Sequence, residues 1–176
     1  MFFMEIVIEF GKMLIPALLV LYAVYLTVKN ILEKEITSKE IDLKIKNYET
    51  LLPLRLQAYE RLTLLLERIS PNNILVRLSN PNYSAVEFQR LIVKEIRDEF
   101  NHNLSQQIYV SEESWGLVNK AVEDTISMIN RTGSSIKEDA KAMDLTKAVF
   151  GEILQDETDS ISLALSQLKK EVSQFY

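Results

Sequence analysis

The chain contains no cysteine and a single histidine, His102, in 176 residues. The missing thiols exclude cysteine nucleophiles, iron–sulfur clusters and zinc sites built on cysteine. They are also typical of proteins that stay in a reducing compartment. One histidine leaves Ser-His-Asp chemistry formally open, but no nucleophile-elbow motif supports it.

Glycine is scarce, and the four glycines at positions 11, 116, 133 and 151 are scattered. Neither a phosphate-binding loop nor a dinucleotide-binding turn can be assembled from them. The net charge is −5, whereas nucleic-acid binding needs a basic surface, so no nucleic-acid partner is expected. No cofactor and no small-molecule substrate are predicted either.

Proline is equally rare, with four residues, while leucine, isoleucine, alanine, glutamate and lysine are abundant. This composition is typical of helices and lacks the regular turn residues of an all-β fold. No internal repeat occurs. The sequence therefore predicts an all-α protein with an N-terminal transmembrane helix and a helical stalk, followed by a bundle of about five or six helices.

What the chain does have is one long apolar run, Met13–Val28, in which Thr27 is the only polar side chain. Together with the upstream residues it is long enough to cross a bilayer with some tilt. Residues 1–29 are therefore predicted to be a membrane anchor. The alternatives are a cleaved signal, which lacks its basic start and cleavage site, and a buried core helix, which would show a polar face. The predicted anchor residues are Leu14, Ile15, Leu18, Leu19, Leu21, Tyr22 and Tyr25.

Lysines follow the apolar run but hardly precede it. Lys12 lies before Met13–Val28, and after it come Lys29, Lys34, Lys39, Lys44 and Lys46. The positive-inside rule then places the N-terminus outside and the C-terminal domain in the cytoplasm.

Residues 30–52 form a charged segment that we interpret as a helical stalk. Ile41, Ile45, Tyr48 and Leu52 have 4-3-4 spacing, which gives a narrow apolar stripe suited to one neighbouring helix, within the chain or from another copy. A break near Ser38 is expected. The alternation of Ile41, Leu43 and Ile45 leaves a short strand as a weaker alternative.

Residues 53–176 are predicted to form the bundle. The first helix is expected to be capped by Thr50, to start at Pro53 and to end at Ile69; Leu54, Ala58, Leu62, Leu65 and Ile69 line one of its two apolar faces. Further helices are expected at 71–78, from Ser84 to about Leu104, from Ser111 to Gly133, at 144–154, and from Thr158 or Asp159 onward. Ser70 and Ser111 are the expected N-caps of two of them, and Ser84 with Glu87 forms a capping box. The last helix is expected to carry an apolar stripe of Ile161, Leu165, Leu168, Val172 and Phe175. Residues 108–110 are expected to be extended.

Two groups of side chains are candidate sites. Glu99 and His102 have the Glu-x-x-His spacing of di-iron bundles, but the second such pair is missing, so a metal role is disfavoured. The charged cluster around Tyr59 is a solvated face, a buried polar network or a binding surface. The amide-rich stretch after His102 either caps a helix end and bonds the loop or forms a partner surface. The candidate partner-binding residues are Arg55, Tyr59, Arg61, His102, Gln106, Gln107 and Tyr109.

Two segments, 52–73 and 95–115, resemble a family of uncharacterised bacterial proteins that have one N-terminal membrane helix and an all-α domain. The resemblance rests on the stretches RLQAYERL and HNLSQQIYV. It implies a fold and a location at the bacterial inner membrane, and it implies no activity.

The expected function is that of a membrane-anchored adaptor or scaffold at the cytoplasmic face of the inner membrane. Its partners would be the lipid bilayer, a second copy of the chain or another inner-membrane protein. The alternative is a membrane-tethered enzyme or ligand-sensing regulator that uses His102 with Glu95 or Glu99.

Overall fold

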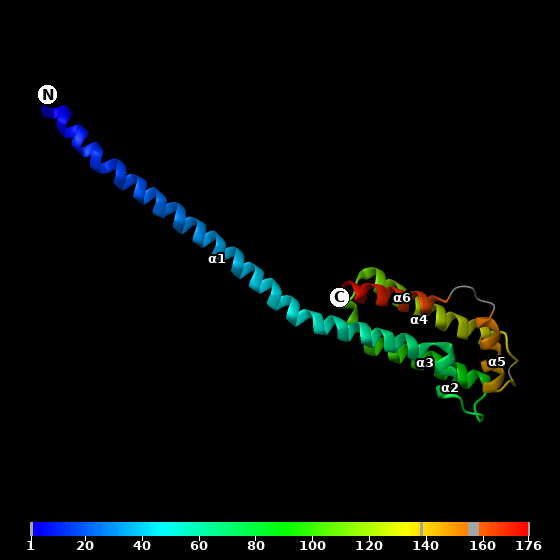
Figure 1. Ribbon diagram of the computed structural model, residues 1–176. Coiled ribbons are helices and arrows are strands. Elements are labelled where there is room, and N and C mark those ends of the chain that lie inside the picture. The colour runs from blue at the N-terminus through cyan, green and yellow to red at the C-terminus, as the bar shows by residue number, and fades with distance from the viewer. Residues whose placement is uncertain (1, 138, 155–158, 176) are drawn as a thin grey trace. The chain divides into compact units, whose positions relative to one another are not determined.

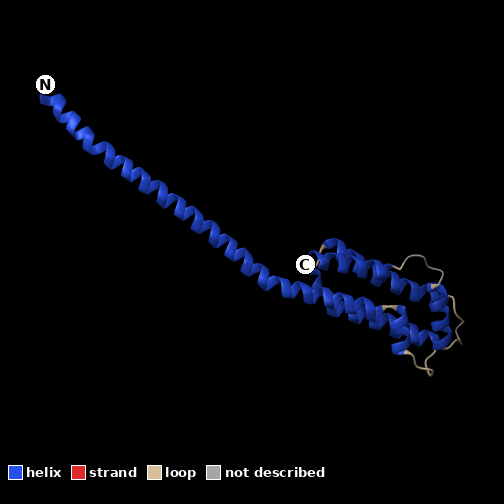
Figure 2. Ribbon diagram, viewed as in Figure 1, coloured by secondary structure: helices blue, strands red, loops and turns tan. Residues whose placement is uncertain are grey.

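The computed structural model describes residues 2–137, 139–154 and 159–175; of residues 4–8, 10 and 11 it describes only the backbone. Six α-helices and two short 3-10 helices account for nearly all of these residues, and no strand occurs among them (Figure 2). The predicted all-α fold is thereby confirmed.

The elements follow one another with short connections (Figure 1). They are α1 (Phe2–Ile69), α2 (Pro71–Leu78), α3 (Ala85–Asn103), η1 (Leu104–Ile108), α4 (Glu112–Ser134), α5 (Ala142–Ile153), α6 (Ser160–Val172) and η2 (Ser173–Phe175). The chain divides into two compact units, Met1–Leu51 and Leu52–Tyr176, and each is described by itself.

The first unit is a single helical stretch whose described side chains are all exposed. It contributes to the one helix, among the residues described, that is long and apolar enough to cross a membrane by length and composition. Thr27 donates its hydroxyl hydrogen to the Ala23 carbonyl oxygen at 2.8 Å, so the one polar side chain of the apolar run is satisfied within the helix.

The stalk is helical as expected, and Ile41 to Ile45 do not form the alternative strand, but three local expectations are wrong. The helix runs through Ser38 without a break. Thr50 does not cap a new helix, because its hydroxyl donates to the Lys46 carbonyl at 2.9 Å. Pro53 lies inside α1: it removes one backbone hydrogen bond, but this stretch is exposed and water can satisfy the freed carbonyl.

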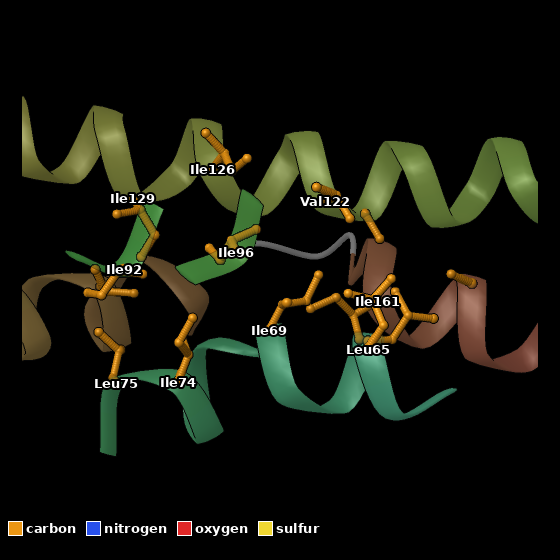
Figure 3. Packing of buried hydrophobic residues seen from close by; sticks show 14 of the residues in the cluster. Leu65, Ile69, Ile74, Leu75, Ile92, Ile96, Val122, Ile126, Ile129 and Ile161 are labelled. Carbon is orange, nitrogen blue, oxygen red and sulfur yellow. The ribbon is translucent and has the colours of Figure 1, made fainter. Parts of the chain in front are cut away.

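The second unit buries the last turns of α1 in its core. Figure 3 shows Leu65 and Ile69 of α1 packed toward Ile161 of α6, with Val122 of α4 facing them. Ile92 and Ile96 of α3 and Ile74 and Leu75 of α2 complete the same cluster. The two-faced packing predicted for residues 53–69 is confirmed from Ala58 to Ile69. Leu54, in contrast, is 41% exposed, because the core begins one turn later.

The predicted start of α3 is confirmed in atomic detail. The Ser84 hydroxyl accepts from the Glu87 backbone N–H at 3.2 Å, and the Glu87 carboxylate accepts from the Ser84 N–H at 2.9 Å. This capping box satisfies two backbone donors that a helix start leaves free. The bounds of α2 are also as predicted, although the Ser70 hydroxyl donates to the Glu67 carbonyl and does not cap α2.

Two expected helix ends differ. Residues 104–108 form the 3-10 helix η1 where an extended segment at 108–110 was expected, since the local hydrogen bonds of the amide-rich stretch continue the helical turn. Gly133 does not terminate α4 with a positive φ; it lies within the helix, which ends at Ser134. A Cβ at position 133 would lie 2.3 Å from Oε1 of Gln89, so this glycine makes room for a side chain of α3.

Helix α5 starts at Ala142, two residues before the predicted Asp144. It is tied to the start of α3 by two backbone hydrogen bonds, Ala85 N–H to Ala140 O at 2.9 Å and Ala142 N–H to Tyr83 O at 3.1 Å. The carboxylate of Asp159 caps α6 by accepting hydrogen bonds from the N–H groups of Ile161 and Ser162. Asp159 was one of the two predicted starts of this helix. The other, Thr158, lies outside the described residues.

Two leucines in the same helix provide a test of the core. Leu62 is fully buried and Leu64 is 52% exposed. Leu62→Ala should lower the free energy of unfolding by about 2–5 kcal/mol, because it removes buried methyl groups and leaves a cavity. The measurement is urea unfolding of the detergent-solubilised chain, followed by fluorescence of its one tryptophan, Trp115.

Leu64→Ala is the matched control and should cost less than about 1 kcal/mol. Equal losses for the two variants would contradict this assignment of the buried face.

Candidate functional site

A polar cluster lies where the bundle part of α1 meets the start of α4 and the end of α6. Its centre is the Glu171 side chain on α6, and this residue is only 9% exposed. Its carboxylate accepts hydrogen bonds from the Ser111 N–H at 3.1 Å, from the Ser111 hydroxyl at 3.0 Å and from the Ser114 hydroxyl. Ser111 also caps α4 by accepting from the Ser114 N–H at 3.1 Å. One carboxylate therefore fixes the start of α4 against α6.

Arg55 closes the cluster from the side of α1. Its Nη2 lies 3.8 Å from Oε1 of Glu171 and donates to the Tyr59 hydroxyl at 3.3 Å, and its Nε donates to the Tyr109 carbonyl at 3.0 Å. The guanidinium carbon lies 4.6 Å from the centre of the Phe175 ring. This is a cation–π contact, and it uses the weakly hydrated face of arginine.

The cluster shifts the acidity of both of its titratable acids. Burial raises the pKa of Glu171, but hydrogen bonds from Ser114, Tyr59 and Ser111 together outweigh it, and the resulting pKa lies below the ordinary value. Burial and the hydrogen bond to Glu171 raise the pKa of Tyr59, with Arg55 offsetting part of the effect. At neutral pH, Glu171 is charged and Tyr59 is neutral, so the Tyr59 hydroxyl is the hydrogen-bond donor toward the carboxylate.

The structure brings together three of the residues proposed from sequence, namely Arg55, Tyr59 and Tyr109, the last through its backbone carbonyl. Arg61 is exposed and does not take part. Since Tyr59 is 3% exposed and Nε and Nη2 of Arg55 are engaged inside the domain, this group is a polar network within the fold.

The remaining candidates after His102 make local bonds. Gln107 donates to the Leu104 carbonyl at 2.9 Å, and Gln106 donates to the Ser105 hydroxyl at 3.3 Å. His102 is exposed, and its Nδ1 lies 3.1 Å from the Asp98 carbonyl oxygen. These bonds hold the transition from α3 into η1.

The carboxylates near His102 are engaged by arginines. Glu99 pairs with Arg68 at 3.3 Å and Glu95 pairs with Arg77 at 2.8 Å, which ties α3 to α1 and α2. Within the described part of the chain, no group of three or more histidine, aspartate or glutamate residues is arranged to hold a metal ion.

Glu171, Ser111, Ser114 and Phe175 were not among the residues proposed from sequence. The apolar stripe of the last helix was expected at Ile161, Leu165, Leu168, Val172 and Phe175. All five residues belong to the core or pack against it, and the most buried face consists of Ile161, Ala164, Leu168 and Glu171. The signal was present, because Glu171 continues a 3-4-3 spacing; a carboxylate at such a position must be paired if it is buried.

A hollow of about 510 Å³ opens between the α1–α2 junction, α4 and the start of α6. Its lining mixes apolar side chains, such as Met128 and Ile153, with the exposed charged residues Lys120, Asp124 and Arg131. It therefore differs from the enclosed apolar cavity that a ligand sensor in the bundle core requires.

A long apolar N-terminal helix followed by an all-α bundle defines a class of helical proteins with one candidate membrane-spanning segment among the residues described. The chain belongs to a family of unknown function, DUF7935, whose model matches residues 5–175. The match confirms that the segments 52–73 and 95–115 belong to an uncharacterised family of helical proteins, and it extends the similarity over both units.

No curated protein and no solved structure matches the chain.

The pKa of Glu171 leads to a pH test. A carboxyl group whose pKa is lower in the folded than in the unfolded chain stabilises the fold fully above its unfolded pKa, and that contribution is lost as the pH falls through the folded value. The wild-type chain should therefore be more stable than Glu171→Gln by about 1–3 kcal/mol at neutral pH. The difference should shrink as the pH falls below the ordinary glutamate value of 4.5.

The measurement is urea unfolding at a series of pH values. Glu60→Gln, at an exposed position of α1, is the control and should leave the pH profile unchanged. A difference between wild type and Glu171→Gln that stays constant to low pH would show that the charge on Glu171 does not stabilise the fold.

Proposed function

We propose that this protein is a membrane-anchored adaptor or scaffold, in which α1 crosses the bilayer and carries the helical bundle at its cytoplasmic face. The observation that carries the proposal is the uncovered state of the first unit: every described side chain from Lys12 to Leu51 is exposed. A helix this long and apolar does not remain uncovered in water. Lipid would cover the segment up to Val28, and a protein partner would cover the stalk.

The stalk supports the second half of this proposal. Within the first unit, Ile41, Ile45 and Tyr48 are 51%, 50% and 53% exposed, so this unit does not cover the stripe by itself. A narrow stripe of this kind suits one parallel helix, and a second copy or another membrane protein would supply it.

The orientation belongs to the same proposal. Lysines follow the apolar run and only Lys12 precedes it, so the bundle would lie on the cytoplasmic side of a bacterial inner membrane. We do not extend the proposal to catalysis, since Glu95 and Glu99 are paired with arginines and His102 contacts a backbone carbonyl.

Site-specific crosslinking tests the proposal in the native membrane. A photoreactive amino acid at Ile45, on the stripe, should give an adduct heavier than the monomer. The same amino acid at Asn47, about 200° around the helix from Ile45, is the matched control and should give much less. Mass spectrometry of the adduct then separates a second copy from a different protein.

Carbonate extraction of the same membranes should leave the full-length chain in the pellet. Recovery of the intact chain in the soluble fraction, or equal crosslinking from the two positions, would refute the proposal.

A further inference from the structure

Two arginines on α3, Arg90 and Arg97, form no ion pair with any residue that the structure describes. The chain has seven arginines, and four of them pair with glutamates: Arg55, Arg68, Arg77 and Arg131. Among the described residues, only three arginines form no ion pair, and two of these line the same groove. In a chain of net charge −5, such a local excess of positive charge is not a consequence of composition.

The groove has a volume of about 430 Å³ and lies along α3 beside the end of α4. Besides the two arginines it is lined by Lys94 and Asp98, which pair with each other at 2.8 Å, and by Val93. The pairing holds the pKa of Lys94 above its ordinary value, so this lysine stays charged but is already engaged. The arginines are thus the cations available to a ligand.

Three amide side chains complete the lining: Gln89, Asn101 and Asn130. Nε2 of Gln89 donates to Oδ1 of Asn130 at 3.0 Å and links α3 to α4 across this part of the groove. Gly133 makes this position possible, because a Cβ there would lie 2.3 Å from the amide oxygen of Gln89. Amide side chains both donate and accept hydrogen bonds, so they can pair with the N–H and C=O groups of a peptide backbone.

We propose that this groove binds an acidic peptide segment of a partner protein, with Arg90 and Arg97 contacting its carboxylates. Arg90 and Arg97 are seven residues apart, which places them about 10 Å apart along the helix axis. That separation is too wide for one small anion, and it lies between about 7 and 13 Å, the distances between carboxylates two and four residues apart on one side of an extended chain. The proposal rests on the proposed function and names the chemistry of one partner.

The test uses the full-length chain in nanodiscs of zwitterionic lipid and a fluorescent peptide of alternating glutamate and serine, with binding followed by anisotropy. The double variant Arg90→Gln/Arg97→Gln should weaken binding by roughly three- to tenfold, as expected for the loss of two exposed ion pairs. Higher salt should weaken wild-type binding more than binding by this variant. A peptide with glutamine in place of glutamate should not bind.

The matched control is Lys147→Gln/Lys169→Gln, which removes the same charge from exposed positions of α5 and α6 and should bind as the wild type does. Unchanged Trp115 fluorescence and unfolding midpoints would establish that both double variants fold. Gln89→Ala leaves the arginines in place and should weaken binding less than their removal.

Three results would overturn the proposal: equal binding by the two double variants, displacement of the peptide by inorganic phosphate at the same concentration, or binding that requires phosphatidylserine in the nanodisc. Failure here is separable from failure of the proposed function. If Arg90→Gln/Arg97→Gln binds the peptide as the wild type does while the Ile45 crosslink persists, the groove assignment is wrong and the adaptor stands. Peptide binding without any crosslink refutes only the proposed partner of the stalk.

Discussion

The bundle depends on the need to cover both apolar faces of the last turns of α1. Leucines and isoleucines recur there on two sides of one helix, and leaving either side in water costs about 25 cal/mol for each Å² of apolar surface. Helices α4 and α6 cover one part of that surface, while α2 and α3 extend the same core. The ion pairs of Arg68 with Glu99 and of Arg77 with Glu95 lie at the edges of this core. They fix the position of α3 relative to α1 and α2 and contribute little to stability.

The sequence was most informative where one local rule decided the outcome. The capping box at Ser84, the cap at Ser111 and the proline that opens α2 all appear as predicted, because each depends on residues within one helical turn. It was least informative where a distant residue decided. Pro53 and Gly133 were expected to mark helix ends; one is tolerated in an exposed helix, and the other makes room for Gln89.

The residues of the candidate site show the same difference between local and distant signals. Arg55 and Tyr59 could be proposed from their own helix, whereas Glu171 lies far along the chain and joins them only in the folded domain. Once Glu171 is included, the cluster is a paired carboxylate inside the fold, typical of groups that specify one packing arrangement. The unpaired arginines of α3 then stand out, since so many other arginines in the bundle have their counter-ion.

The backbone bridge between Ser84 and Lys141 has a consequence for the order in which the bundle assembles. It closes a loop that contains all of α3, η1 and α4, and closing such a loop costs chain entropy before it yields two hydrogen bonds. Packing of α3 on α4 brings the two ends of that loop near each other and lowers this cost. The antiparallel pair of α3 and α4 is therefore expected to form first during folding. Helix α5 then docks on this pair and forms the two backbone hydrogen bonds.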